Sequence, residues 1–230
     1  MVNPGTDPGI EAEIGAIHHL YLALVPKLDA EAGLGGKLIY SGELNPEGFR
    51  LVRAANIAGA ASLSASADPE QQKRAIREGV IDFLVTSVDE ALRILKNEIR
   101  KRQGVAVGIA LDPESVEQEM IQRGVVPDLL FAGAEIPGWT DQGVERLESA
   151  TIPSGTTFLT LKLNQYLAGR AVEVDAMFLA ALPTDDFAGR RWFTLSPRYL
   201  DSGARQYRSA LCDVEAASIL VDRVGEIKKE

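Results

Sequence analysis

This 230-residue chain has one cysteine and two histidines, so it offers few thiol nucleophiles and few sulfur or imidazole ligands for a metal ion. Cys212 is a possible nucleophile. Its only possible bases, His18 and His19, are far away in the sequence, so we expect Cys212 to pack in the core. Adjacent histidines on a helix point about 100° apart and cannot both face one ion. The sequence therefore predicts no metal site, and we interpret His18 as a buried histidine beside core aromatics.

Polar residues at the ends of expected strands offer a second chemistry, the binding of a small ligand. In an open α/β sheet, ligands bind beyond the carboxyl ends of the strands. The candidates at those ends are Gly42, Glu43, Ser66, Ser87, Asp112 and Glu135. Three of them are acidic, which suits a cationic or hydroxyl-rich ligand better than a nucleotide. Each has a competing interpretation as a cap or loop residue, and for Ser87 and Asp112 we favour that interpretation.

The elements that would position these residues follow from an alternation of short apolar runs and amphipathic stretches. The expected strands are Lys37 to Ser41, Ala60 to Ala65, Ile81 to Thr86, Val105 to Leu111 and Asp128 to Ala132. The expected helices are Pro46 to Ala58, Pro69 to Glu78, Val88 to Arg102 and Pro113 to Arg123. Such alternation predicts an α/β fold, a Rossmann-like doubly wound parallel sheet of about five strands.

Three junctions between strand and helix carry the same pattern: Asn45-Pro46-Glu47, Asp68-Pro69-Glu70 and Asp112-Pro113-Glu114. Asn or Asp caps free backbone N–H groups, Pro occupies the first helical position, and Glu favours the positive end of the helix dipole. The pattern predicts where helices start and is no sign of a catalytic motif.

The two ends of the chain are less regular. Glu11 to Ala32 has helical spacing of apolar residues, although Pro26 is expected to kink the helix or end it early. In the C-terminal part, Thr156 to Leu163 fits a strand or a helix, and so does Val174 to Leu182. The sequence also predicts a strand at Arg191 to Leu195, a helix opened by Ser196-Pro197, and a C-terminal helix at Asp213 to Ile227.

No linker divides the chain, so we expect residues 1–230 to form one domain. Residues 36–132 would be its Rossmann core, and residues 133–230 a C-terminal α/β extension packed on that core.

Charge and composition exclude some classes of partner. The net charge of −9 is spread over both halves and argues against nucleic acid, which needs clustered Lys and Arg. No apolar run approaches the roughly 20 residues that span a bilayer, so we expect no membrane partner. A single cysteine fits a reducing compartment, and we expect the protein in the cytoplasm.

Arginines and aromatic residues occur together near the C-terminus, in Arg190 to Phe193, at Arg198-Tyr199, and in Arg205 to Arg208. These residue types are enriched at protein interfaces. The segments therefore fit a homo-oligomer interface, and they fit packing within the chain equally well.

Several segments, in the same order, resemble the NAD-binding core of urocanase (urocanate hydratase). They lie between about residues 36 and 130: Gly36 to Ile39, Asn56 to Gly59, Ser62 to Ala65 before Asp68-Pro69, Val80 to Asp82, Leu92 within Ala91 to Lys101, Val105 to Leu111, and Gly124 to Leu129. The resemblance implies a Rossmann core that holds NAD as an electrophile for urocanate, with water added and no net redox change. It also makes Asn56 a weak candidate for contact with a cofactor or ligand.

The sequence departs from the family where the phosphate should bind. The family has a run of glycines followed by Ala-Gln-Pro, and this chain has Glu43 to Phe49 instead. Asn45 is expected to cap the helix, and Glu43 and Glu47 add negative charge where a phosphate would lie. Where the family has an acidic residue for the ribose, this chain has Ser66.

The sequence predicts a urocanase-like protein without urocanate hydratase activity, acting as a small-ligand-binding or protein-interaction module. The alternative is an NAD-dependent lyase with an altered cofactor loop. The resemblance makes NAD the candidate cofactor, and the loop argues against it.

Overall fold

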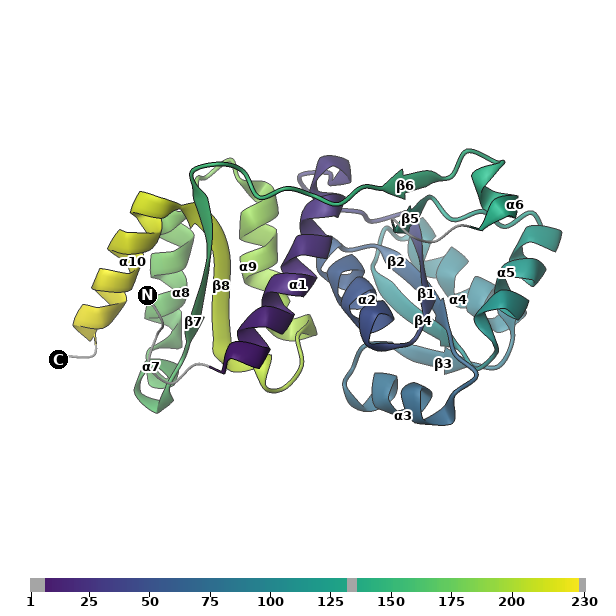
Figure 1. Ribbon diagram of the computed structural model, residues 1–230, viewed down its shortest axis with the longest axis horizontal. Helices are drawn as coiled ribbons and strands as arrows, with labels where there is room; N and C mark the ends of the chain where they lie inside the picture. Colours follow the sequence, from purple (N-terminus) through teal and green to yellow (C-terminus); the bar gives the residue numbers. More distant parts are fainter. Residues whose placement is uncertain (1–6, 132–135, 228–230) are drawn as a thin grey trace. The chain divides into compact units, whose positions relative to one another are not determined.

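The computed structural model describes residues 7–131 and 136–227, and it divides into two compact units (Figure 1). The core unit comprises Leu20 to Ala150. The extension unit combines the residues up to His19 with those from Thr151 onward. The packing of a C-terminal extension on the core stays a prediction.

Six parallel strands form the sheet of the core unit. They are β1 (Leu38–Glu43), β2 (Ala61–Ala65), β3 (Phe83–Val85), β4 (Val105–Ile109), β5 (Leu129–Phe131) and β6 (Glu145–Leu147). Their order is β3-β4-β2-β1-β5-β6, and every neighbouring pair is parallel. Strands β2 and β4 are buried along their whole length, as expected for central strands covered on both faces.

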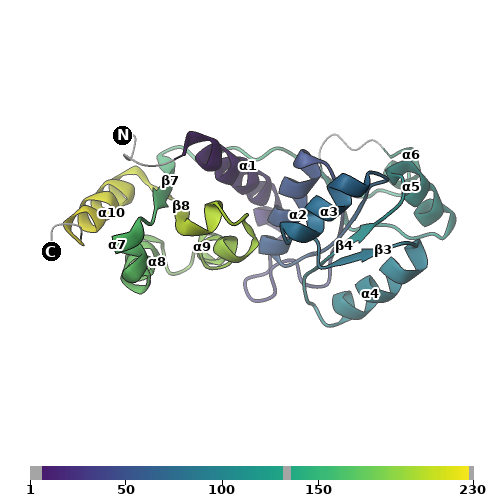
Figure 2. The same cartoon turned by 90° about the horizontal axis from the view of Figure 1, so that it is seen from below.

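Helices cover both faces of this sheet (Figure 2). They are α2 (Pro46–Ala58), α3 (Pro69–Arg77), α4 (Val88–Arg100), α5 (Pro113–Gln122) and the short α6 (Pro137–Thr140). Phe49 of α2 and Ala75 of α3 belong to the apolar cluster on one face. Leu92 of α4 and Val116 of α5 belong to the cluster on the other. The predicted Rossmann-like, doubly wound α/β fold is confirmed.

The five strands and four helices expected in the core are present, with ends that differ by a few residues; Ala132 lies outside the described residues. The sixth strand, β6, was not predicted from the sequence. It has three residues, and Glu145 and Arg146 are exposed, so it lacks the apolar run by which the other strands were recognised.

The three predicted helix caps are confirmed. Asn45 accepts hydrogen bonds from the N–H groups of Glu47 and Gly48, Asp68 from Glu70, and Asp112 from Ser115. In each helix a proline follows the cap, where its missing N–H costs nothing. Repetition of one local pattern thus fixed the start of three helices.

The extension unit contains a second, smaller sheet. Its elements are the first part of α1 (Pro8–Leu24), strands β7 (Thr156–Lys162) and β8 (Tyr207–Asp213), helices α7 (Gln165–Gly169), α8 (Ala171–Ala181), α9 (Phe187–Tyr199) and α10 (Val214–Ile227), and a 3-10 turn at Ala204–Gln206. Strands β7 and β8 are antiparallel, with Thr156 opposite Asp213 and Lys162 opposite Tyr207. The α-helix α1 ends at Leu24, and a 3-10 turn with Pro26 at its first positions follows, so the expected early end is confirmed.

The small sheet is covered on both faces. On one face, Leu161 of β7 and Cys212 of β8 join a cluster with Val174 of α8 and Leu220 of α10. On the other face, Trp192 of α9 donates a hydrogen bond from Nε1 to Ser209 Oγ at 3.1 Å, and α1 contributes His18. The unit therefore has three layers, helices on either side of two strands.

His18 and Cys212 are core residues, as predicted. The His18 ring is stacked on Phe158, with 4.1 Å between ring centres, and meets the Trp192 ring edge-on at 4.6 Å. Burial lowers the pKa of His18 to about 3, with a smaller contribution from His19. Burial likewise raises the pKa of the Cys212 thiol, which makes it a poor nucleophile at neutral pH.

Two predictions for the C-terminal part are wrong. Arg191 to Leu195 is not a strand, and Ser196-Pro197 does not open a helix: both lie inside α9. The helix starts at Asp186, whose carboxylate accepts from the Gly189 N–H, and Pro197 falls in its last turn. The buried residues of α9 are spaced as on one helix face, and that spacing was masked by the β-favouring residues around Trp192.

The remaining alternatives are decided by the structure. Thr156 to Lys162 is a strand, whereas the stretch containing Val174 is a helix. In the arginine-rich segments, Trp192, Phe193 and Tyr207 are buried, whereas Tyr199 is partly exposed. A homo-oligomer interface at these segments stays a prediction. No helix among the described residues has the length and apolar character needed to cross a membrane.

Candidate functional site

The carboxyl edge of the six-stranded sheet is the place where this fold offers a site. From β1 the chain crosses to β2 on one side, whereas from β5 it continues to β6 on the other. The strand order therefore changes direction between β1 and β5. In open α/β sheets, ligands bind at such a point, beyond the carboxyl ends of the strands.

The turn from β1 into α2 is folded tightly against the sheet. Gly42 has a φ of +71°, and the pairing of β1 with β2 is irregular between Tyr40 and Glu43. The Leu44 N–H then donates to the Ala65 carbonyl at 2.8 Å, and the Leu44 side chain is fully buried in the cluster around Phe49. Leu44, an apolar residue, therefore covers the end of β2 where the chain turns into α2.

The first amides of α2 already have acceptors. Asn45 Oδ1 receives the N–H groups of Glu47 at 3.0 Å and of Gly48 at 2.9 Å. A side chain on Gly48 is excluded, because a Cβ there would lie 1.9 Å from the Glu43 carbonyl oxygen. Gly48 therefore permits the close approach of Glu43 to the helix.

The other predicted site residues at this edge are held by local hydrogen bonds. Ser66 is fully buried, and its Oγ accepts from the Asp68 N–H at 3.1 Å. Ser87 Oγ accepts from the Glu90 N–H at 3.3 Å, and Asp112 from Ser115 at 3.2 Å. The interpretation of Ser87 and Asp112 as caps is confirmed.

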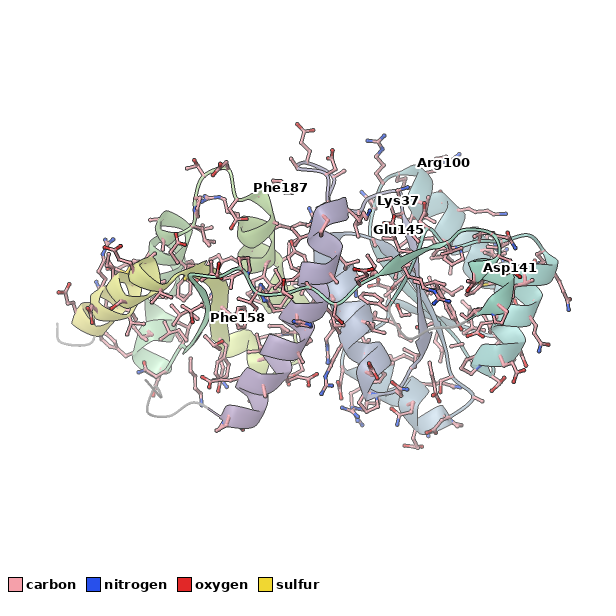
Figure 3. The ribbon with its side chains drawn as sticks, turned by 45° about the horizontal axis from the view of Figure 1, so that its top comes forward. Lys37, Arg100, Asp141, Glu145, Phe158 and Phe187 are labelled. Atoms are coloured by element: carbon pink, nitrogen blue, oxygen red, sulfur yellow. The ribbon has the colours of Figure 1, made fainter. Side chains whose placement is uncertain are left out.

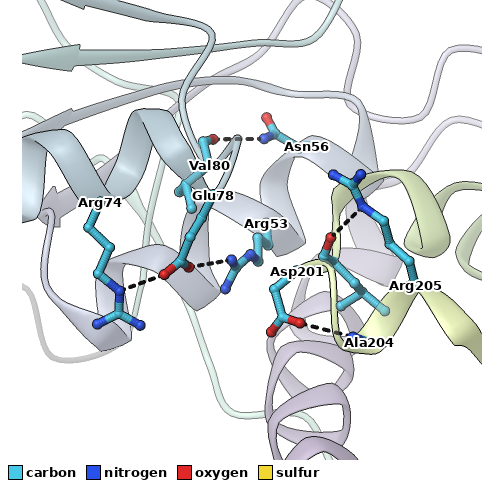
Figure 4. Close-up of polar contacts among 9 residues, drawn as sticks. Arg53, Asn56, Arg74, Glu78, Val80, Asp201, Ala204 and Arg205 are labelled. Carbon is cyan, nitrogen blue, oxygen red and sulfur yellow. Dashed lines mark hydrogen bonds and ion pairs between the residues drawn. The ribbon is translucent and has the colours of Figure 1, made fainter.

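The last two candidates do not join this group. Asn56 lies near the C-terminal end of α2, and because α2 runs back along the sheet, this end lies at the opposite edge. Its side-chain amide donates to the Val80 carbonyl at 3.3 Å (Figure 4). Glu135 lies outside the described residues. The structure thus places five of the seven candidates, Gly42, Glu43, Ser66, Ser87 and Asp112, at strand ends along one edge.

At the opposite edge of the sheet, ion pairs connect α2 and α3. Glu78, at the end of α3, accepts from Arg53 at 2.9 Å and from Arg74 at 2.7 Å (Figure 4). The Arg74 guanidinium also lies 5.1 Å from the centre of the Phe49 ring. These contacts join α2 to α3.

Sequence reasoning missed a pair of residues near the carboxyl edge. The Tyr40 hydroxyl, on β1, donates a hydrogen bond to Glu117 Oε1, on α5, at 2.8 Å. The Tyr40 ring is 2% exposed and meets Trp139 edge-on at 5.0 Å. Glu117 is half-buried. The pair lies on the sheet face covered by α4 and α5.

Both groups of this pair are shifted toward their protonated forms. Burial raises the pKa of Tyr40 far above its ordinary value, and the negative charge of Glu117 adds to that shift. Burial also raises the pKa of Glu117. The hydrogen bond from Tyr40 opposes this, and the charges of Glu114 and Asp112 reinforce it. A half-buried carboxyl group with a raised pKa can accept or release a proton nearer neutral pH than an exposed one.

This arrangement suits a ligand with a positive charge or hydroxyl groups, which acidic oxygens can bind. Among the described residues, no group of three or more His, Cys, Asp or Glu side chains is placed to hold a metal ion. The sequence carried a weak signal for the pair. Glu117 directly follows the core residue Val116 on α5, so it lies beside the buried face of that helix.

Comparisons with known proteins agree with the fold of the core unit. The profile of the urocanase Rossmann-like domain matches residues 20–134, half of the chain. The chain is also similar to an S-methyl thiourocanate hydratase of Variovorax sp. (strain JCM 16519 / RA8), with 27% identity over 143 residues. That stretch is 60% of this chain and 26% of the relative, so the chain spans about a quarter of the relative's length.

Proposed function

Because the chain belongs to the urocanase family through its Rossmann-like domain, we propose that it is a ligand-binding module of that family without urocanate hydratase activity. The ligand is a small cationic or hydroxyl-bearing molecule, and NAD is not its cofactor. The observation that carries the proposal is the Asn45 cap on α2.

A pyrophosphate at this fold's first turn is bound by free backbone N–H groups at the helix start. Here the N–H groups of Glu47 and Gly48 donate to Asn45 instead. Glu43 and Glu47 also bring negative charge to the turn. Two like charges about 4 Å apart repel by roughly 1 kcal/mol in water and about 4 kcal/mol at an effective dielectric of 20. The residues of this turn therefore do not fit a pyrophosphate.

The class of ligand is inferred from the acidic residues close to β1 at the carboxyl edge of the sheet. Glu117 presents a half-buried carboxyl group beside the Tyr40 hydroxyl, and Asp112 adds a negative charge nearby. Carboxylates repel a phosphate and attract an ammonium group or a sugar hydroxyl. We therefore place the ligand against Glu117, with Tyr40 holding that carboxyl group in position.

The first test is cofactor binding. The purified chain is denatured to look for co-purified nucleotide and then titrated with NAD and NADH by calorimetry. We expect no nucleotide and no binding at about 1 mM. Binding at micromolar concentration would contradict the proposal.

A matched variant tests whether the turn between β1 and α2 is the reason that NAD does not bind. Glu43→Gln, Asn45→Gly and Glu47→Gln together remove two charges and free the two amides. Gain of NAD binding in this variant alone would support the role given to the cap. Equal binding by both proteins would contradict it.

The second candidate function is hydration of a urocanate-like compound, and the similarity to the S-methyl thiourocanate hydratase of Variovorax favours it. Its test is the loss of urocanate or S-methyl thiourocanate absorbance when the chain is incubated with NAD. Turnover that Glu117→Gln abolishes would establish this function in place of the first. No turnover with either compound is the result that our proposal expects.

A further inference from the structure

The two sheets differ in how they present their edge strands. The six-stranded sheet ends at β3 and β6, which have three residues each, and β6 carries exposed Glu145 and Arg146. Short or charged edge strands are a common protection against pairing with another chain. Strand β7 has neither feature. It has seven residues without proline, its one charge is at its end (Lys162), and within the described part of the chain it pairs with β8 alone.

The exposure of β7 fits an open edge. Six of its seven residues are partly exposed and only Leu161 is buried, whereas four of the seven residues of β8 are buried. The Phe158 side chain projects from β7 (Figure 3) and stacks on His18 in its own unit. An isolated pair of strands is marginally stable in water, and further strands make a sheet more stable.

The hydrogen bonds at the two ends of β7 show which main-chain groups point away from β8. The Leu163 N–H donates to Gln206 at 2.8 Å, and the Val214 N–H to Gly155 at 3.2 Å. Bonding pairs alternate along an antiparallel ladder, so odd-numbered residues from Gly155 to Leu163 bond to β8. The N–H and C=O groups of Phe158 and Thr160 therefore point to the open edge. At the start of the strand, the Thr156 N–H instead donates to the Pro153 carbonyl at 3.3 Å.

We propose that β7 pairs with β7 of a second copy of this chain, antiparallel and centred on Leu159. This register places Phe158 opposite Thr160 of the second copy and Lys162 opposite its Thr156. The two pairs of Phe158 with Thr160 then consist of groups that point outward on both strands, so their main-chain donors and acceptors match. At each end of the ladder the Lys162 N–H can donate to the Thr156 carbonyl of the other copy, while the Thr156 N–H keeps its bond to the Pro153 carbonyl. The result is a four-stranded antiparallel sheet with two-fold symmetry.

The side chains support a second copy over an unrelated strand. Phe158 beside Thr160 is an aromatic and β-branched pair, a favourable cross-strand combination. Lys162 would lie opposite Thr156 of the second copy. In that second copy, Asp213 on β8 is opposite Thr156, so Lys162, Thr156 and Asp213 form one row across three strands. In the single chain, Lys162 Nζ lies 5.9 Å from the centre of the Tyr207 ring on β8. The spacing between strands is about 4.8 Å, so on pairing the long Lys162 side chain can turn from Tyr207 to reach the Asp213 carboxylate of the second copy. Two-fold symmetry forms this contact twice and opposes no like charges.

The test is the mass of the full chain by light scattering and sedimentation over a range of concentrations. We expect a dimer. Thr160→Pro removes an outward N–H that the pairing with β8 does not use, and we expect it to weaken the dimer by about a hundredfold or more. Thr160→Ala, the matched control, keeps the N–H and should remain dimeric. The circular dichroism spectrum of Thr160→Pro should match that of the unaltered chain. If that variant misfolds, exchange of the charges at Lys162 and Asp213 tests the proposed pairing instead.

Charge exchange tests the register by a second route. Lys162→Glu and Asp213→Lys should each weaken the dimer, and the two changes together should restore it, because the pair forms again with reversed charges. A monomer at all concentrations would overturn the proposal, and so would failure of the double variant to recover. A dimer that survives Thr160→Pro but is lost in Val172→Lys, a change on the exposed surface of α8, would put the interface elsewhere and overturn it as well.

Discussion

The two units of this chain reach a buried core by different routes. In the core unit, six parallel strands are covered by helices whose starts are fixed by local caps at Asn45, Asp68 and Asp112. In the extension unit, two antiparallel strands are held between helices by contacts among aromatic rings that are distant in sequence, such as His18 and Trp192. We therefore expect the loss of a single contact to cost less stability in the core unit than in the extension unit, where a few large side chains fill the space beside the small sheet.

The largest expected effect is at Trp192. Trp192→Ala should lower the free energy of unfolding by about 3–5 kcal/mol, because it leaves a cavity beside His18 and removes the partner of Ser209. Urea unfolding followed by circular dichroism measures the change. Phe187→Ala, on the same helix and 39% exposed, is the control and should cost no more than about 0.5 kcal/mol. Equal losses of unfolding free energy in the two variants would contradict the view that the small sheet depends on a few large side chains.

Acid should weaken the extension unit through His18. Its pKa falls from 6.5 to about 3 on folding, so the unfolded chain binds the extra proton between these values. The contribution of His18 to stability is fully present above pH 6.5 and is lost as the pH falls toward 3, by up to about 1.4 kcal/mol per pH unit.

Unfolding curves at several pH values measure this loss. His18→Phe should reduce the dependence on pH, whereas His19→Ala, a change to an exposed neighbour, should retain it. A His18→Phe variant with the same pH dependence as the unaltered chain would contradict the assignment.

The core unit should respond less to a single change. Asn45→Ala removes the acceptor for two amides of α2 and should cost about 1 kcal/mol. Asn45→Ser keeps a capping oxygen and should restore most of that stability. Thermal unfolding of both variants measures these changes. A loss as large as that of Trp192→Ala would contradict the expected difference between the two units.

The smallest effect should be a gain. The Ser62 hydroxyl, on β2, is buried and has no hydrogen-bond partner among the described residues. Ser62→Ala removes that unsatisfied group and should stabilise the chain by up to about 1 kcal/mol. Ser64→Ala is the matched control, since the Ser64 hydroxyl donates to the Val107 carbonyl at 3.4 Å and its loss should bring no gain. Denaturant midpoints compare the two.

Prediction from the sequence succeeded where structure is set locally. The alternation of apolar runs and amphipathic stretches gave the strands and helices of the core unit, and the three caps gave helix starts. It failed at β6, β8 and α9. Strand β6 has no apolar pattern, and strand β8 was not recognised. In α9, the aromatic residues around Trp192 favour a strand by residue type, but their spacing places them on the buried face of a helix.

The candidate site divides in the same way. The capped turn at Asn45 was predicted because a cap and the helix it starts are adjacent in sequence. The hydrogen bond from Tyr40 to Glu117 joins residues 77 positions apart, and no local pattern specifies that distance. By itself the sequence determined the fold class, the family and the rebuilt turn, since all depend on short-range order. Only the tertiary structure decided which buried polar groups meet, because strand order and helix packing bring them together.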